Sequence, residues 1–426
     1  MVKSYCGEIK DPVHGYVYIT EEETAIIDSY AVQRLRRLRQ LAGAEYVYPG
    51  ANHTRFEHSV GVMYLAGRVT GNPNMAEIVD EEEAEMIRLA ALLHDVGHGP
   101  FSHVFEELLD SELGKTHEDM TVWIVKESSL KDSLRRIGHR PEEVAKLAVG
   151  RLHKPGRAFL DQILSSAVDV DKQDFIVRDT LHTGAEYGFI DISRLVDTFD
   201  VLAGNLAVDL AALSALESLI IARIESFKSI YFHRVGRAAQ IMLATAMKEA
   251  NVDLGLTDFK TPEEYLAMDD YTVWTALKGC KKSKRIIEDL ERRKMIKCAY
   301  ERTFYEKDPM VMNIFSRDAY RKQLRQEIAE EAKVEPETVT IDVPTVPSVP
   351  NHHAMLAETV EIPVFHRTHT GEKVPQRLSE ISRIFETLRG FINVLRVYTD
   401  EENRERVGRA SSRILDKIPA SARVSY

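Results

Sequence analysis

The chain has 426 residues, a length typical of two or three domains with a large buried core. Hydrophobic residues make up 44% of it and charged residues 29%, which excludes a disordered or fibrous protein. With 56 basic and 67 acidic residues the net charge is −11, so general nucleic-acid binding is disfavoured.

In chain order, a short strand-like run at residues 16–19 comes first, and helical patterns dominate from there to about residue 295. Apolar residues recur at three- and four-residue spacing, as on one face of an α-helix, in several long segments. These segments are residues 54–70, 80–95, 101–109, 116–127, 168–181, 211–231 and 236–250. The sequence therefore predicts a mostly α fold for residues 1–295.

The character of the chain changes after residue 295. A helical pattern at 317–333 leads into a Pro-rich segment at 334–350. Strand candidates follow at 358–365 and 391–398, with a helix expected near 376–388 between them. We therefore expect a smaller α+β C-terminal lobe over residues 296–426, after a helical domain over residues 1–295.

The sequence predicts neither a membrane span nor a secretory leader. The most apolar stretch, residues 201–224, is interrupted by charged residues, and the N-terminal MVKSYCGEIKDP lacks the apolar core of a signal peptide. The three cysteines are too few and too scattered for a disulfide framework. These features predict a reduced, cytoplasmic protein without membrane contacts.

Two segments look like nucleic-acid-binding elements but are better explained as surface structure. HRTHTGEK at 366–373 looks like a zinc-finger linker, but the nearest upstream cysteine, Cys298, lies 68 residues earlier, so a turn is predicted. Residues 278–297 hold nine basic and three acidic residues, which favours a solvated helix face over an RNA or DNA contact. Nucleic acid is therefore not an expected partner.

Histidine carries the first chemical information. Six of the fifteen histidines lie between His53 and His117. Histidine is the commonest metal ligand and a proton donor near neutral pH, so such a cluster indicates a site. In LAALLHDVGHGPFSHVF, residues 89–105, a helical pattern ends at His94 and Asp95, where both side chains can point at one ion.

A divalent cation with nitrogen and oxygen ligands needs about two more groups from the protein. TRFEH supplies His58 at the start of one helix, and DVDKQD supplies carboxylates at the start of another. Asp169 and Asp171 both remain candidates on this reasoning alone. Helical spacing puts Asp171 on one face with Phe175, Asp179 and His182.

From about Lys10 to Ala250, the chain resembles the HD-domain phosphohydrolases, and most closely the dNTP triphosphohydrolases related to the animal SAM-and-HD-domain enzyme. No SAM domain is expected ahead of the first matching block. The resemblance is carried by ordered blocks of sequence: KDPVHG, RLRQLAGAEYVYPGANHTRFEHSVGVMYLA, HDVGHGPFSH, THE and DVDKQDFIVRD.

The resemblance implies a set of metal ligands and a set of catalytic histidines. The implied ligands are His58, His94, Asp95 and Asp171. The cation is then a divalent transition metal, one of Fe, Mn, Ni, Co or Zn, with Mg expected on the triphosphate. Around the phosphates the resemblance puts His98, His103 and His117, and we favour His103 as the general acid. Glu106 stands where the family has an aspartate.

The resemblance also implies substrate contacts. Arg55, Lys172 and Arg223 resemble a cationic clamp on the triphosphate. Four residues resemble the sugar pocket: Gln40, Leu41, Asp179 and Tyr231. Gln40 and Asp179 can bond a 3′-hydroxyl, and a tight wall beside them would exclude a 2′-hydroxyl. Phe175 stands where some relatives have tyrosine.

A regulatory nucleotide site is suggested as well. Asp28, Gln33 and Arg36 match residues that read a guanine base in relatives, and Arg194 is a candidate contact to a second nucleotide. Residues 208–211 replace a basic pair of the animal enzyme, so the second site departs from the family pattern. We expect a homo-oligomer, with a tetramer favoured, tightened by a guanine nucleotide.

Three classes of function follow. The favoured one is a dNTP triphosphohydrolase that releases deoxynucleoside and triphosphate. The second is another HD phosphohydrolase, acting on nucleoside monophosphates, cyclic dinucleotides or nucleic-acid ends. The third is a regulatory protein whose metal site is not catalytic. The full ligand quartet with three further histidines argues against the third class.

Overall fold

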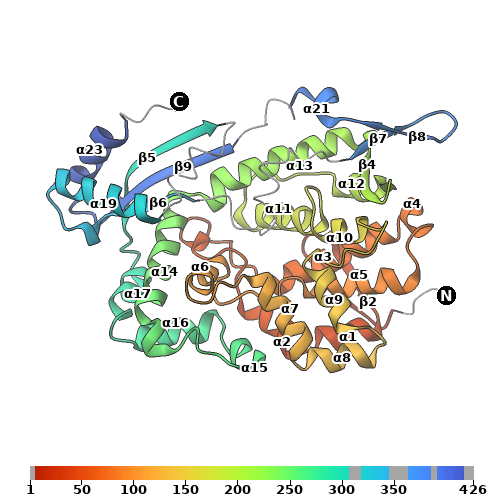
Figure 1. Cartoon of the computed structure of the whole chain (residues 1–426), viewed down its shortest axis with the longest axis horizontal. Coiled ribbons are helices and arrows are strands. Elements are labelled where there is room, and N and C mark those ends of the chain that lie inside the picture. The colour runs from red at the N-terminus through yellow and green to blue at the C-terminus, as the bar shows by residue number, and fades with distance from the viewer. Residues whose placement is uncertain (1–4, 307–317, 345–362, 385–390, 417–426) are drawn as a thin grey trace.

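The computed structural model describes residues 5–306, 318–344, 363–384 and 391–416 (Figure 1). The chain opens with an antiparallel hairpin of β1 (Gly7–Asp11) and β2 (Gly15–Ile19). Short helices follow: α1 (Glu21–Ile27), α2 (Tyr30–Arg34), η1 (Leu35–Arg37) and η2 (Ala44–Tyr46). The predicted strand at 16–19 is therefore confirmed.

The central helices form the body of the molecule; the five longest of them coincide with predicted segments, and the four shorter ones fall outside those segments. They are α3 (Arg55–Thr70), α4 (Pro73–Ala76), α5 (Glu81–Leu93), α6 (His103–Leu113), α7 (His117–Glu127), α8 (Leu130–Arg136), α9 (Pro141–Ala148), α10 (Phe159–Leu164) and α11 (Val170–Thr183). Local sequence explains their starts: Asp80 and Thr116 form capping boxes before α5 and α7, and Asp169 caps α11.

A second group of helices encloses this body. It consists of α12 (Ile192–Thr198), η3 (Leu210–Ala212), α13 (Leu213–Ser226), the π-helical turn η4 (Phe227–Tyr231), α14 (Arg234–Leu254), α15 (Pro262–Leu266), α16 (Asp270–Gly279) and α17 (Lys284–Glu291). One hydrophobic core runs from Val17 to Tyr398 through both groups. Among the described residues no helix is both long enough and apolar enough to cross a membrane.

The segment after residue 295 contributes to two separate sheets. One contains β5 (Lys297–Glu306), β9 (Phe391–Thr399) and β6 (Thr340–Asp342), and it packs with α19 (Asp318–Ala332) and α23 (Arg404–Leu415) around a core of its own. The short turn η5 (Pro336–Thr338) precedes β6. This is the predicted α+β lobe, so the fold class is confirmed.

The other sheet lies at the opposite end of the molecule (Figure 1). In it β3 (Phe199–Leu202) and β4 (Asn205–Asp209) are joined by β7 (Val364–Arg367) and β8 (Lys373–Gln376). β4 and β7 pair in parallel, with Val208 opposite Val364. HRTHTGEK forms the β7–β8 hairpin, as the predicted turn requires. The domain boundary at residue 295 stays a prediction.

Among the described residues the expected helix near 376–388 is present but starts later and is interrupted. Gln376 belongs to β8, α21 spans Leu378–Ile381, and after a break at Ser382 helical conformation resumes at Arg383 and Ile384. Gln376 belongs to the sheet because β8 pairs with β7, with Gln376 opposite Val364. The remainder of the prediction at 385–388, like part of the strand candidate at 358–362, lies outside the described residues.

Candidate metal centre and active site

Four side chains from three helical regions converge at one point. His58 Nε2 lies 3.0 Å from Asp171 Oδ1 and 3.2 Å from His94 Nε2. His94 Nε2 lies 3.3 Å from Asp95 Oδ1. His58 comes from α3, His94 and Asp95 from the end of α5, and Asp171 from the first turn of α11. Donor atoms at these separations suit a shared cation, and two imidazoles with two carboxylates suit a divalent transition metal.

Hydrogen bonds on the far side of each imidazole prepare both histidines for coordination. His58 Nδ1 lies 2.8 Å from Asp174 Oδ2, and His94 Nδ1 lies 2.7 Å from the carbonyl oxygen of Ala91. Both partners accept, so both histidines carry a proton on Nδ1. This leaves the Nε2 lone pairs for a cation, as is usual in protein metal sites.

Asp174, which the sequence reasoning did not single out, is itself held by buried charges. Arg178 donates to both of its oxygens at 2.8 and 2.9 Å, and His14 Nε2 lies 2.6 Å from Oδ1. Asp11 accepts a bond from Arg178 at 2.8 Å. A Cβ at Gly61 would lie 2.0 Å from Asp174 Oδ1, so only glycine lets α3 approach α11 here. The motifs KDPVHG and DVDKQDFIVRD thus meet behind His58.

The two aspartates that compete in the sequence have different surroundings. Asp169 caps α11 and receives a bond from Lys172 Nζ at 2.6 Å, whereas Asp171 faces both imidazoles. Burial alone would raise the pKa of Asp171, but its hydrogen bonds to His58 and His94 bring the pKa below the ordinary value. The geometry favours Asp171 over Asp169 as a ligand, and the assignment of the quartet stays a prediction.

Charge around the centre keeps its carboxylates ionised and its histidines basic. Burial would raise the pKa of Asp95, but the Arg55 guanidinium, 2.5 Å away, more than offsets it, and the pKa lies well below the usual range. Burial would lower the pKa of His58, but hydrogen bonds to Asp171 and Asp174 raise it to about 10. The two carboxylates favour positive charge at this point, and a cation bound here would replace the proton on His58 Nε2.

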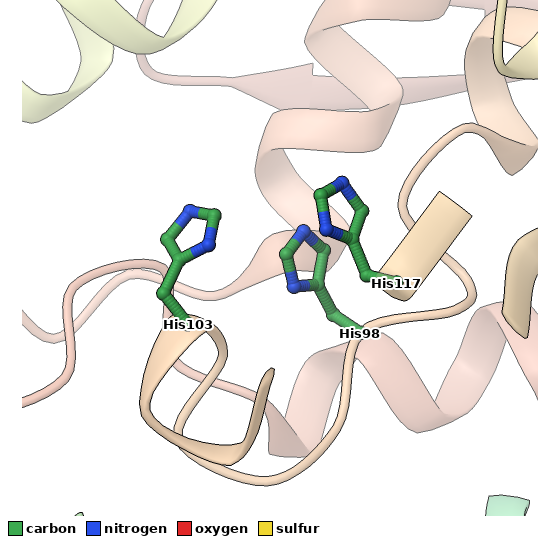
Figure 2. Close-up of side chains that lie close together, drawn as sticks. All are labelled: His98, His103 and His117. Carbon is green, nitrogen blue, oxygen red and sulfur yellow. The ribbon is translucent and has the colours of Figure 1, made fainter. Parts of the chain in front are cut away.

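The three further predicted histidines lie together (Figure 2), and His98 Nε2 lies 3.4 Å from Asp95 Oδ1 of this centre. The rings of His98 and His117 stack with centroids 4.0 Å apart, and His103 stands edge-on to His98 at 5.1 Å. Gly97 permits this contact, because a Cβ there would lie 2.1 Å from the carbonyl oxygen of His117. Imidazole lone pairs lie in the ring plane, so two stacked rings are poorly arranged to share a second ion.

Glu106 joins two of these histidines. Its oxygens lie 2.9 Å from His103 Nδ1 and 2.6 Å from His117 Nδ1, so the longer side chain still bridges both rings. Burial would lower the pKa of His117, but the charge of Glu106 raises it. Burial lowers the pKa of His98 far below its usual value, with help from the charge of Arg55. The site therefore combines a neutral and a readily charged imidazole.

The residues predicted for the sugar pocket also meet. Tyr231 Oη donates to Asp179 Oδ2, and Leu41 shares a small apolar cluster with Ile230 and Tyr231. The ring of Phe175 lies 6.2 Å from that of Tyr231. The Oε1 of Gln40 is buried without a hydrogen-bond partner among the described residues. The sequence reasoning missed the role of His53, whose Nε2 lies 2.8 Å from Asp179 Oδ1.

The predicted cationic clamp is partly engaged within the protein. Arg55 is buried and donates to Ser102 Oγ at 2.7 Å as well as to Asp95. Lys172 is buried with its ammonium on Asp169. Burial lowers the pKa of Arg223, and the charges of Asp169 and Asp171 act in the opposite direction. The phosphate-binding roles of all three stay predictions.

The residues predicted to read a guanine base share one short segment. Gln33 Nε2 donates to the carbonyl oxygen of Ile27, and Arg36 Nε donates to Gln33 Oε1, both at 2.9 Å. Asp28 and Arg36 are exposed. Arg194 is not brought to this group: it lies on α12, at a distance from α2 in Figure 1, and it donates to the carbonyl oxygen of Ala211.

Comparison with known proteins agrees with this geometry. The chain matches the HD domain over residues 55–179 and the HD-associated region over residues 190–424. It is 32% identical over 318 residues to the "Deoxynucleoside triphosphate triphosphohydrolase SAMHD1 homolog" of Dictyostelium discoideum, covering 68% of this chain and 59% of that protein. It is 31% identical over 306 residues to the human "Deoxynucleoside triphosphate triphosphohydrolase SAMHD1", covering 63% of this chain and 49% of that protein.

Relatives without an assigned activity match as well. An uncharacterized protein of Methanocaldococcus jannaschii is 31% identical over 316 residues, covering 72% of this chain and 62% of that protein. The chain thus spans about half to three fifths of these curated relatives. The crystal structure of a hypothetical protein from Aquifex aeolicus superimposes with a TM-score of 0.75 at 27% identity, covering 95% of this chain and 99% of that one. The chain belongs to the HD-domain family of metal-dependent phosphohydrolases, with an HD-associated region following its HD domain.

Proposed function

We propose that the protein is a metal-dependent dNTP triphosphohydrolase, which converts a dNTP and water into a deoxynucleoside and triphosphate. The observation that carries this proposal is the single face of α11. Asp171 meets the histidines of the metal centre, and Asp179, eight residues later, meets Tyr231. That spacing corresponds to about 12 Å of helix. It suits a substrate with phosphate at one end and a sugar hydroxyl at the other.

The chain supplies groups for each part of the reaction. His58, His94, Asp95 and Asp171 would hold a divalent transition metal, which polarises a phosphoryl oxygen and acidifies a bound water. Attack by water at the α-phosphorus forms a new P–O bond while the bond from phosphorus to the 5′ oxygen breaks. His103 gives its Nε2 proton to the leaving 5′ oxygen, and Glu106 holds the other ring nitrogen. His98 and His117 bind phosphate oxygens beside it.

The sugar pocket would select deoxyribose. Gln40 Oε1 lacks a hydrogen-bond partner among the described residues and can accept from a 3′-hydroxyl, and Asp179 would offer a second acceptor. Leu41 and Tyr231 form an apolar wall on which a 2′-hydroxyl would find no partner. Arg55, Lys172 and Arg223 would face the triphosphate, with Mg bound to the phosphates, and Phe175 packs at the side of Tyr231.

Regulation by nucleotide is part of the proposal. Asp28, Gln33 and Arg36 offer a carboxylate, an amide and a guanidinium along the short segment from the end of α1 to η1, a set able to meet the edge of a guanine. Arg194 would belong to a second nucleotide site. Both functions would operate in a cytoplasmic homo-oligomer, with a tetramer favoured.

A second candidate function is hydrolysis of a smaller phosphate ester, such as a nucleoside monophosphate. It is favoured by the engagement of Lys172 with Asp169 and of Arg55 with Asp95 and Ser102, which leaves fewer cationic donors for three phosphates.

Product analysis distinguishes these reactions. The purified protein is loaded with Fe, Mn, Ni, Co or Zn and supplied with each dNTP or dNMP, with and without dGTP. The proposal expects deoxynucleoside and triphosphate from dNTPs. Pyrophosphate with dNMP as products would refute it, and inorganic phosphate released from dNMP alone would establish the second candidate.

A further inference from the structure

The loop between α5 and α6, residues 97–102, carries His98 and leads directly into His103. Its backbone is irregular: Phe101 and Ser102 have φ of 58° and 57°, and Ser102 has ψ of −120°. Residues other than glycine rarely adopt such conformations unless the surrounding structure holds them. The position of two predicted catalytic histidines therefore depends on what contacts this loop.

Three side chains from outside the HD match hold the loop by its backbone. Tyr265 Oη donates to the carbonyl oxygen of Gly97 at 2.8 Å, and Arg34 donates to that of His98 at 2.8 Å. Asp270 Oδ1 accepts from the amide of Phe101 at 2.7 Å. Arg34 lies on α2, whereas Tyr265 and Asp270 lie on α15 and α16, and all three are buried.

The same contacts extend to the metal centre. The other oxygen of Asp270 accepts from the amide of Arg39 at 2.9 Å, and the carbonyl oxygen of Arg39 accepts from Ser102 Oγ at 2.8 Å. Ser102 Oγ in turn accepts from Arg55, which donates to Asp95. Asp270 thus holds two backbone segments next to the Ser102 hydroxyl: Phe101, which precedes Ser102, and Arg39, whose carbonyl oxygen accepts from that hydroxyl. The Ser102 hydroxyl in turn orients Arg55.

We propose that Asp270, Arg34 and Tyr265 are positioning residues that hold the loop 97–102 in the conformation that the reaction needs. The HD-associated region, through α15 and α16, would thereby complete an active site whose reacting groups lie in the HD domain. The proposal rests on the proposed function only in the kinetic experiments, which measure a rate with a dNTP.

The chain offers a matched control for Asp270. Asp161 on α10 is 7% exposed against 6% for Asp270, and it also accepts from two backbone amides, those of Leu152 and His153, each at 2.8 Å. His153 has a positive φ of 51°. Asp161→Asn therefore disturbs an equivalent loop contact away from the predicted catalytic groups. Asp270→Asn and Asp161→Asn should cost similar amounts of fold stability.

We expect Asp270→Asn to lower kcat about 10- to 100-fold, as misplacement of catalytic groups does, with KM and metal content close to those of the wild type. Asp161→Asn should keep the wild-type kcat. Tyr265→Phe, which removes a single hydrogen bond and keeps the ring, should lower kcat about 2- to 10-fold. Equal kcat in Asp270→Asn and Asp161→Asn, or a wild-type kcat in Tyr265→Phe, would overturn the proposal.

Hydrogen exchange gives a readout that needs no substrate. In Asp270→Asn the amides of His98, Gly99, Phe101 and Ser102 should exchange faster than in the wild type, and in Asp161→Asn they should not. If the wild-type protein releases no triphosphate, the proposed function fails while this measurement still tests the positioning role. Unchanged exchange in Asp270→Asn would refute that role whatever the substrate is.

Discussion

The metal centre differs from the predicted activator surface, formed by Asp28, Gln33 and Arg36, in how its side chains are supported. The centre gathers His58, His94, Asp95 and Asp171 from distant parts of the chain, and partners behind each imidazole fix its orientation. The activator surface takes Gln33 and Arg36 from one short segment, where they bond to each other and to local backbone. The first set is therefore already oriented for the predicted metal. Binding of the predicted nucleotide by the second would require existing hydrogen bonds to be exchanged for new ones.

The largest effect should come from the centre itself. Asp95→Ala removes a predicted ligand and the carboxylate partner of Arg55, which leaves a buried cation unpaired. We expect complete loss of both bound metal and hydrolysis. Elemental analysis of the purified variant tests this, and metal content equal to that of the wild type would show that the ligand assignment is wrong.

Asp270, which holds the loop next to the metal centre, should affect how the free energy of unfolding depends on pH. Burial raises the pKa of Asp270 from 3.8 to about 6, since backbone amides only partly compensate. A carboxyl whose pKa is higher in the folded state holds its proton longer there, so wild-type stability falls as pH rises from about 4 to 6. The Asp270→Asn variant has no carboxyl to titrate at this position, so its free energy of unfolding does not fall for this reason.

The difference in unfolding free energy, variant minus wild type, should therefore increase by about 3 kcal/mol at most between pH 4 and 7. Denaturant titrations at several pH values measure it. A difference that is constant with pH would mean that Asp270 ionises as an ordinary carboxyl.

The sugar pocket is intermediate between the metal centre and the activator surface. Its residues are buried or half-buried, and they include an acceptor without a partner among the described residues, Gln40 Oε1. Tyr231→Ala should admit rNTPs and lower the ratio of kcat/KM for dGTP over GTP by about 10- to 100-fold, the cost of an unpaired buried hydroxyl. Tyr231→Phe keeps the wall and should retain most of the ratio. A wild-type ratio near one would contradict the pocket as described.

The activator surface should give the smallest effect. Arg36→Ala removes one exposed guanidinium, so dGTP should stimulate hydrolysis of another dNTP about 2- to 5-fold less than in the wild type, at unchanged metal content. Light scattering with dGTP should show an oligomer in the wild type, with a tetramer favoured. A wild-type monomer at micromolar concentration with dGTP would argue against the assembly.

Much of the helical body could be predicted because its signals are local. Apolar periodicity predicted residues 54–70 and 80–95 as helices, and they appear as α3 and α5, the second with a capping box at its start. The TRFEH, HD and DVDKQD motifs supplied the candidates, the family resemblance selected His58, His94, Asp95 and Asp171 from them, and the structure brings these four together. Their roles as ligands and the domain boundary at 295 stay predictions.

Contacts between distant segments could not be predicted in the same way. Asp174 looks like any acidic helix residue in the sequence, and only the meeting of α3, α11 and the N-terminal hairpin shows it between His58 and Arg178. Arg34 belongs to a run of basic residues, a pattern typical of a solvated helix face. It is nevertheless fully buried and donates to the carbonyl oxygens of His98 and Met268. Helical spacing in a sequence predicts which face of a helix a residue occupies. It does not predict which distant segment of the chain packs on that face.

The parallel pairing of β4 with β7 has a consequence for how the chain folds. Val208 and Val364 are register partners although more than 150 residues separate them, and β7 also brings β8 into the sheet. Such a pairing closes a long loop, so it is expected to form late and slowly. During synthesis the outer edge of β4 stays uncovered until the C-terminal part of the chain has emerged. A nascent or truncated chain would therefore carry an open strand edge, a common starting point for aggregation.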